Sequence, residues 1–202
     1  MRVSEIHIDR LERSHELYDR AKEIILGGTQ TISKQVECYD AEFFPAYIER
    51  GEGSRLWDID GNEYVDFIAG LGPIILGYCH PAVDLAVHNQ LAKGVLFSSN
   101  SALEVELAEK LTNIIPNAEK VRFFKTGAEA TSAAVRLARN FTQREKVISC
   151  GYHGWHDWYV AQNKEGGIPR ILSDYIVRVP FGNFDAASEA LHSIGPEVAF
   201  VI

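Results

Sequence analysis

Two short segments of the chain have residue types that could bind a phosphorylated ligand. The first is the turn Thr126-Gly127-Ala128, which follows the apolar residues 121–125 and precedes a segment with helical spacing. The first turn of a helix has unpaired backbone N–H groups and a partial positive charge. Because Gly127 and Ala128 are small, a phosphate could approach these N–H groups closely. This turn therefore predicts a phosphate-binding site.

The second segment is Gly151-Tyr152-His153-Gly154, which follows the apolar residues 146–150. In α/β proteins, ligands bind at the loops that follow the carboxyl ends of the strands. An aromatic or imidazole ring in such a loop could stack on a flat ring attached to the phosphate. Together, the two segments predict a phosphorylated aromatic cofactor, and therefore an enzyme.

Two other interpretations of the second segment stay open. Its aromatic side chains could pack against one another and bind nothing. Alternatively, His153, His156 and Asp157 could bind a metal, because two histidines and an acid are zinc-ligand types. Since no further ligand residue stands out in the sequence, we favour stacking and predict no metal site.

Alternating helices and strands must position these two segments. Apolar spacing predicts helices over 129–141 and 184–193, and strands over 121–125, 146–150, 176–179 and 197–202. Strands that alternate with helices form mostly parallel sheets, which helices cover on both faces. The sequence therefore predicts an α/β fold with a mostly parallel sheet.

The beginning of the chain has a different pattern. An apolar stripe between Leu11 and Ile25 predicts a helix that Gly27-Gly28 ends. Further on, the turn Asp60-Gly61 separates two segments in which apolar residues alternate with polar ones, a pattern typical of a β-hairpin. Ser101 and Glu104 have the spacing of a capping box, which predicts the start of another helix.

The composition argues against several classes of partner and location. With 28 Asp and Glu residues against 20 Lys and Arg residues, the net charge is −8, which disfavours nucleic acid and anionic membranes. The first twenty residues are too charged for a signal peptide, and the apolar residues 67–78 are too short to span a bilayer. The three cysteines lie far apart and predict free thiols in a reducing cytoplasm.

Several motifs of the chain resemble those of class III aminotransferases. Residues 55–66 (RLWDIDGNEYVD) resemble the hairpin motif of that family, and residues 72–81 (GPIILGYCHP) resemble its next conserved segment. The family's order continues through residues 103–109, 121–123, 126–131, 134–139 and 151–154. The resemblance covers nearly the whole chain, and it is greatest to glutamate-1-semialdehyde 2,1-aminomutase and its aminotransferase relatives.

The resemblance implies a fold-type I transferase that uses pyridoxal 5′-phosphate. In that family, the positions that match Gly127 and Ala128 bind the cofactor phosphate, with Thr126 beside them. The position that matches Tyr152 stacks on the pyridine ring, with His153 adjacent. The cofactor acts as an electron sink, so the resemblance implies transfer of an amino group from an amino donor to a small aldehyde or ketone.

Two departures from the family pattern bear on activity. The family's Schiff-base lysine and its pyridinium-binding aspartate are expected beyond Ile202, and Lys125 does not replace that lysine. We therefore predict no catalytic residue in this chain, which should be inactive alone. The second departure lies at residues 31–34 (TISK), where the aminomutases have a Ser-Pro-Val-Arg-like substrate segment. Lys34 is the candidate substrate residue there, although it is a point charge without the planar fork of arginine.

The resemblance also implies an organisation and partners. We expect residues 1–70 to be a segment of the small domain, and residues 71–202 to be part of the large α/β/α domain. The substrate could resemble glutamate-1-semialdehyde or a sugar, and family members imply a cytoplasmic homodimer. The alternative is a non-catalytic module that binds a phosphorylated ligand.

Overall fold

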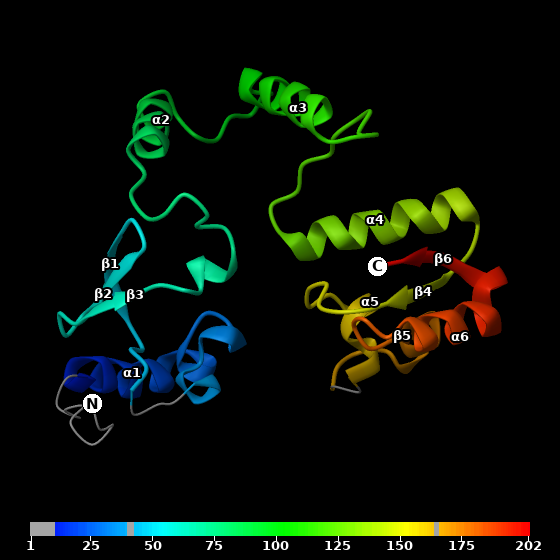
Figure 1. Cartoon of the computed structure of the whole chain (residues 1–202), viewed down its shortest axis with the longest axis horizontal. Coiled ribbons are helices and arrows are strands. Elements are labelled where there is room, and N and C mark those ends of the chain that lie inside the picture. Colours follow the sequence, from blue (N-terminus) through cyan, green and yellow to red (C-terminus); the bar gives the residue numbers. More distant parts are fainter. Residues whose placement is uncertain (1–10, 40–42, 164–165) are drawn as a thin grey trace. The chain divides into compact units, whose positions relative to one another are not determined.

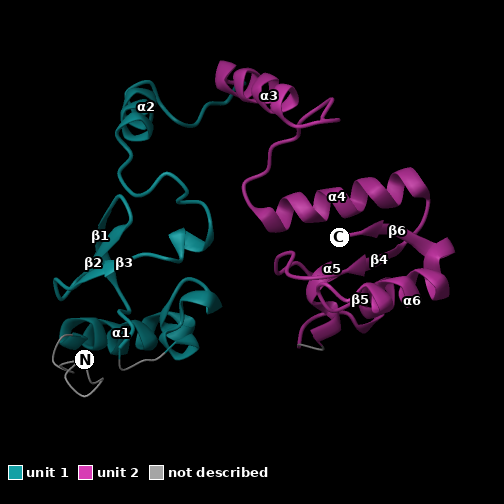
Figure 2. Ribbon diagram, viewed as in Figure 1, with its two compact units in different colours: residues 1–100 teal, residues 101–202 magenta. Residues whose placement is uncertain are grey.

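The computed structural model describes residues 11–39, 43–163 and 166–202, and the chain divides into two units, residues 1–100 and 101–202 (Figure 2). The boundary that the sequence predicted, between residues 70 and 71, lies inside the first unit. The assignment of residues 1–70 and 71–202 to a small and a large domain stays a prediction.

The first unit contains helix α1 (Glu12–Ile24) and an antiparallel sheet with the strand order β1 (Ile48–Glu52), β2 (Arg55–Asp58) and β3 (Glu63–Val65) (Figure 1). The predicted hairpin at Asp60-Gly61 is confirmed, and Gly61 has a φ of 87°, which favours glycine. Strand β1 was not predicted. The remaining elements are η3 (Leu26–Gly28), η4 (Ile32–Lys34), η5 (Val36–Cys38), η6 (Ala69–Leu71) and helix α2 (Pro81–Leu91).

Two carboxylates at the β2–β3 turn accept several hydrogen bonds in the first unit. Asp58 is fully buried and accepts hydrogen bonds from the Asn62 amide at 2.8 Å and the Tyr64 hydroxyl at 2.7 Å. Burial, together with this hydrogen bond to Asp58, raises the pKa of the Tyr64 hydroxyl. Asp60 accepts from the backbone amides of Arg13 and Ser14, at 2.9 and 3.0 Å. The hairpin turn therefore caps the first turn of α1.

The second unit is an α/β arrangement, as predicted. Its elements are α3 (Ala102–Ile114), α4 (Gly127–Thr142), β4 (Lys146–Ser149), α5 (Asp157–Val160), η7 (Ala161–Asn163), η8 (Arg170–Tyr175), β5 (Ile176–Arg178), α6 (Phe184–Ile194), η9 (Gly195–Glu197) and β6 (Val198–Val201). The sheet has the order β5-β4-β6, and both pairings are parallel. Figure 1 draws α4 and α6 on opposite sides of this sheet, and Val135 of α4 is buried like Val147 and Ile148 of β4. No helix in the described ranges is long and apolar enough to cross a bilayer.

One predicted strand is wrong. Residues 121–125 form no regular secondary structure, and the side chains of Phe123 and Phe124 are 42% and 44% exposed. A strand is stable only when a neighbour pairs with its backbone. In the part of the chain that the structure describes, no strand pairs with residues 121–125. The apolar pattern therefore predicted an extended segment, but it could not show whether a neighbouring strand pairs with that segment.

Candidate functional site

The N-terminus of α4 begins with a capping box at Thr126. The Thr126 hydroxyl accepts a hydrogen bond from the Glu129 amide at 3.3 Å, and the Glu129 carboxylate accepts from the Thr126 amide at 2.8 Å. The Thr126 amide, followed by the Thr126 hydroxyl, holds the pKa of Glu129 below its ordinary value. The Glu129 carboxylate thus bonds to the amide of Thr126, the residue just before the helix.

Two amides in the first turn of α4 stay available. Among the described residues, the backbone N–H groups of Gly127 and Ala128 have no hydrogen-bond acceptor. Gly127 is exposed, and a Cβ atom built on it would meet no atom within 4 Å. The helix has 16 residues, so the partial positive charge of its N-terminus is well developed. The exposed end at Gly127 fits a phosphate group, whereas Ala128 is buried against Gly154, and the roles of both residues stay predictions.

The loop that follows β4 presents Tyr152 to solvent. Its glycines, Gly151 and Gly154, have φ values of 85° and 103°, which favour glycine. The Tyr152 ring is 79% exposed and touches the edge of Tyr159, at 5.9 Å between ring centroids. His153 Nε2 donates to the Cys150 carbonyl oxygen at 2.7 Å. Because the Tyr152 ring is open on one side, it could cover a flat ligand, and its stacking role stays a prediction.

The structure brings the loop and the turn together. A Cβ atom on Gly154 would lie 2.8 Å from the Ala128 Cα atom, so the two backbones are in close contact. The Thr131 hydroxyl, one turn further along α4, lies 2.9 Å from the His153 carbonyl oxygen and donates to it. The phosphate-binding candidates and the ring-covering candidates are therefore neighbours, although about 25 residues separate them in sequence.

Sequence reasoning missed the residues that make this contact. Thr131 and Ser132 bond to the loop and to the segment after it, and Trp158 and His156 bond to Ser132. The only sequence cue is a pair of adjacent hydroxyl residues inside a helix, where such side chains usually bond locally.

The alternative metal site has no support in the geometry. No group of three or more His, Cys, Asp or Glu side chains is arranged to hold a metal ion in the described ranges. One ring nitrogen of each histidine has a protein partner: His153 Nε2 bonds to the Cys150 carbonyl, and His156 Nδ1 bonds to Ser132.

Lys34, the candidate substrate residue, is exposed at the end of η4 in the first unit. Its role as a substrate ligand stays a prediction.

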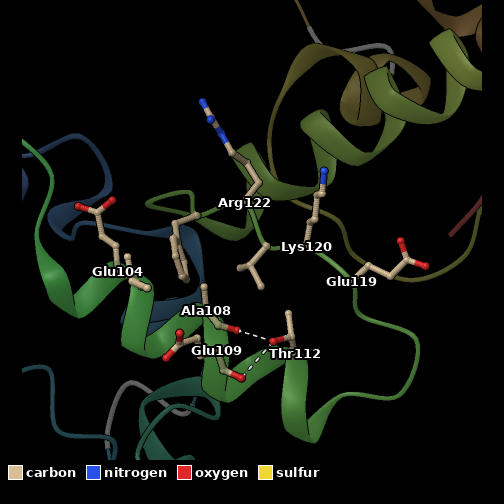
Figure 3. A pocket seen from close by; sticks show the side chains of 10 residues that line it. Glu104, Ala108, Glu109, Thr112, Glu119, Lys120 and Arg122 are labelled. Carbon is tan, nitrogen blue, oxygen red and sulfur yellow. Dashed lines mark hydrogen bonds between the residues drawn. The ribbon is translucent and has the colours of Figure 1, made fainter.

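A cavity of about 730 Å³ lies elsewhere in the second unit, between α3 and residues 119–123 (Figure 3). Its lining includes the acids Glu104 and Glu109 and the base Lys120. The Thr112 hydroxyl, also in the lining, bonds to the Ala108 and Glu109 carbonyls of its own helix. The lining contains none of the predicted cofactor residues, so the cavity is separate from the candidate site.

Comparisons with known proteins agree on one family. Residues 38–189 match the family described as Aminotransferase class-III. The chain is 38% identical, over 96% of its length and 46% of the relative's, to 3-aminobutyryl-CoA aminotransferase of Cloacimonas acidaminovorans. It is 34% identical, over 99% of its length and 48% of the relative's, to glutamate-1-semialdehyde 2,1-aminomutase of Methanosarcina acetivorans.

A solved structure has the same fold as this chain. The FumI protein of Sphingopyxis sp. MTA144, in its PLP internal aldimine form, matches with a TM-score of 0.85 and 28% identity, over 94% of this chain and 45% of that protein. The chain thus spans about half the length of the relatives it matches. The family match over residues 38–189 includes both segments of the candidate site.

Proposed function

Because this chain belongs to the class III aminotransferase family, we propose that it is the N-terminal part of a pyridoxal-phosphate-dependent transaminase or aminomutase. The whole protein would move an amino group between an amino donor and a small aldehyde or ketone. The observation that carries the proposal is the pair of available amides at Gly127 and Ala128, directly beside the loop with the exposed Tyr152 ring.

Each residue of the site has a role that its contacts support. The amides of Gly127 and Ala128 would bind the cofactor phosphate, and the Tyr152 ring would cover the pyridine ring. The Thr126 hydroxyl is already bonded to Glu129, so it would mainly hold the turn in place. His153, with its Nε2 bonded to the Cys150 carbonyl, would support Tyr152. When bound, pyridoxal phosphate supplies an electron sink for the negative charge that deprotonation leaves on carbon.

The proposed substrate is a small amino or carbonyl compound. The two curated relatives are named for 3-aminobutyryl-CoA and for glutamate-1-semialdehyde, and we propose that Lys34 would bind an acidic group of the substrate. The lysine and the aspartate that react with and orient the cofactor would lie in the rest of the protein.

We also propose that the protein is a cytoplasmic homodimer. Helix α2 has no buried residue, and Val83, Leu85 and Val87 are each about half exposed, an apolar surface that the rest of the protein or a second copy would cover. All three cysteines are free thiols, as in proteins of a reducing compartment.

The test uses the full-length protein and pyridoxal phosphate. We expect stoichiometric binding, a covalent link that borohydride reduces, and a labelled lysine beyond Ile202. Amino transfer would then be assayed with 3-aminobutyryl-CoA and with glutamate-1-semialdehyde. Binding without a reducible link would contradict the transaminase proposal and favour the non-catalytic module. A stoichiometric transition metal with no cofactor binding would favour a metal hydrolase instead.

A further inference from the structure

We propose that Ser132 and His156 are positioning residues, which hold the loop of residues 151–154 against the first turns of α4. They would keep the phosphate-binding amides and the Tyr152 ring at a fixed separation. Because cofactor binding is itself proposed above, this role depends on that proposed function.

Ser132 is the centre of a hydrogen-bond cluster. Its hydroxyl oxygen lies 2.8 Å from the Ala128 carbonyl oxygen, 2.8 Å from Trp158 Nε1 and 2.7 Å from His156 Nδ1. Ser132, His156 and Trp158 are all half-buried, so water competes little for these bonds. The cluster connects the second turn of α4 with the segment that follows the loop.

The chemistry of these groups decides which nitrogen of His156 carries a proton. A carbonyl only accepts and an indole N–H only donates, so the Ser132 hydroxyl donates to Ala128 and accepts from Trp158. A hydroxyl has a single proton, and Ser132 donates it to the Ala128 carbonyl. The third bond forms only if His156 Nδ1 carries a proton and donates to Ser132. With all three bonds formed, His156 carries a proton on Nδ1 and donates it to Ser132.

Two further contacts connect the loop with the same helix. The Thr131 hydroxyl donates to the His153 carbonyl at 2.9 Å, and Gly154 packs on Ala128 so closely that no side chain fits between them. The helix backbone connects Ser132 rigidly with Gly127 and Ala128. Loss of the Ser132 cluster would let the ring-covering loop move relative to the phosphate-binding amides, and the cofactor would bind both groups less well.

The test measures the binding of pyridoxal phosphate to the full-length protein, together with the visible circular dichroism of the bound cofactor. Asparagine can place an N–H near the position of His Nδ1, whereas glutamine places it near Nε2. We therefore expect His156→Gln, which removes one partly buried hydrogen bond, to weaken binding about tenfold, and Ser132→Ala, which removes all three bonds of the cluster, to weaken it at least as much. Both should also reduce the dichroism, which reports the orientation of the ring. His156→Asn should retain most of both signals.

A matched control is available on α6. Ser188 and His192 form another serine–histidine pair, at 3.4 Å between Ser188 Oγ and His192 Nδ1, but both are exposed. Ser188→Ala should change neither signal. If Ser132→Ala does not fold, Trp158→Phe removes the indole N–H while keeping an aromatic ring, although a smaller one, and it should weaken binding a few-fold.

Three results would overturn the proposal. In the first, His156→Asn and His156→Gln lose affinity and dichroism equally. In the second, the Ser132 and Trp158 variants, both folded, bind the cofactor like the wild type. In the third, the wild type itself does not bind the cofactor, which also removes the proposed function. The first two leave that function intact.

Discussion

Helices α1 and α4 differ in what satisfies their first backbone amides. At α1, the carboxylate of Asp60 accepts from the amides of Arg13 and Ser14, at 2.9 and 3.0 Å. At α4, the amides of Gly127 and Ala128 have no acceptor in the part of the chain that the structure describes. Both helix ends have a partial positive charge.

This difference separates the structural use of the α1 end from the ligand-binding use that we propose for the α4 end. Asp60 belongs to the turn of a hairpin, so its bonds to α1 fix the helix on the sheet of the first unit. The capping box of α4 serves only the amides of Thr126 and Glu129. A helix can therefore be well capped for folding and still offer two amides to an anion.

The largest expected effect, on cofactor affinity, comes from placing an acceptor at the available amides of α4. Gly127→Asp would place a carboxylate where the phosphate is proposed to bind. It would then occupy the helix end in the way that Asp60 occupies the end of α1. We expect roughly a hundredfold weaker binding of pyridoxal phosphate, since two charge-assisted hydrogen bonds are lost. A titration of the full-length protein measures this effect. Gly127→Ala is the control, because its Cβ atom meets no protein atom within 4 Å and it adds no charge, so it should weaken binding far less than Gly127→Asp. Normal binding by Gly127→Asp would show that the phosphate lies elsewhere.

A smaller effect, on stability, is expected from removing the acceptor at the first amides of α1. Asp60→Ala removes the acceptor of the Arg13 and Ser14 amides, which should lower the free energy of unfolding by about 1 kcal/mol. Hydrogen exchange at these two amides should become faster, while binding of pyridoxal phosphate should not change. Asp60→Asn keeps one acceptor oxygen, and it should lose less stability. An unchanged exchange rate in Asp60→Ala would mean that Asp60 does not protect these amides.

The smallest effect concerns the Glu129 carboxylate. Bonds to the Thr126 amide and hydroxyl keep its pKa below the ordinary 4.5. The folded pKa is lowered, so its stabilisation of α4 is complete above pH 4.5 and is lost as the pH falls through the folded pKa. Exchange of the Thr126 amide should therefore become faster in acid. Glu129→Gln does not titrate, so its exchange should lack this additional acid dependence. An equal dependence in both proteins would contradict a capping role for the charge.

Features set by neighbouring residues could be predicted from the sequence. The Asp60-Gly61 turn and the Ser101–Glu104 capping box were both confirmed, because residues within a few positions of each other determine them. Residue type and spacing also pointed to the Thr126 turn and the loop of residues 151–154, which contact each other in the structure, while their roles stay predictions.

Features that depend on distant residues could not be predicted. The extended residues 121–125 need a pairing partner that lies outside their own pattern. Strand β1 needed a register with β2 that includes an irregularity between Ile48 and Arg50. The bond between Ser132 and His156 joins residues 24 positions apart, and each looks ordinary in its local sequence.

The close approach of Gly154 to Ala128 has a practical consequence for protein engineering. In a library that varies every residue of this loop, most variants at position 154 should fail to fold. Even the Cβ atom of alanine would clash with the helix backbone there, and the φ of 103° is one that residues other than glycine rarely adopt. Trp155 and Asp157 are exposed, so substitutions there should leave the protein folded. A mutational study of this loop should therefore keep Gly154 constant and start from those two positions.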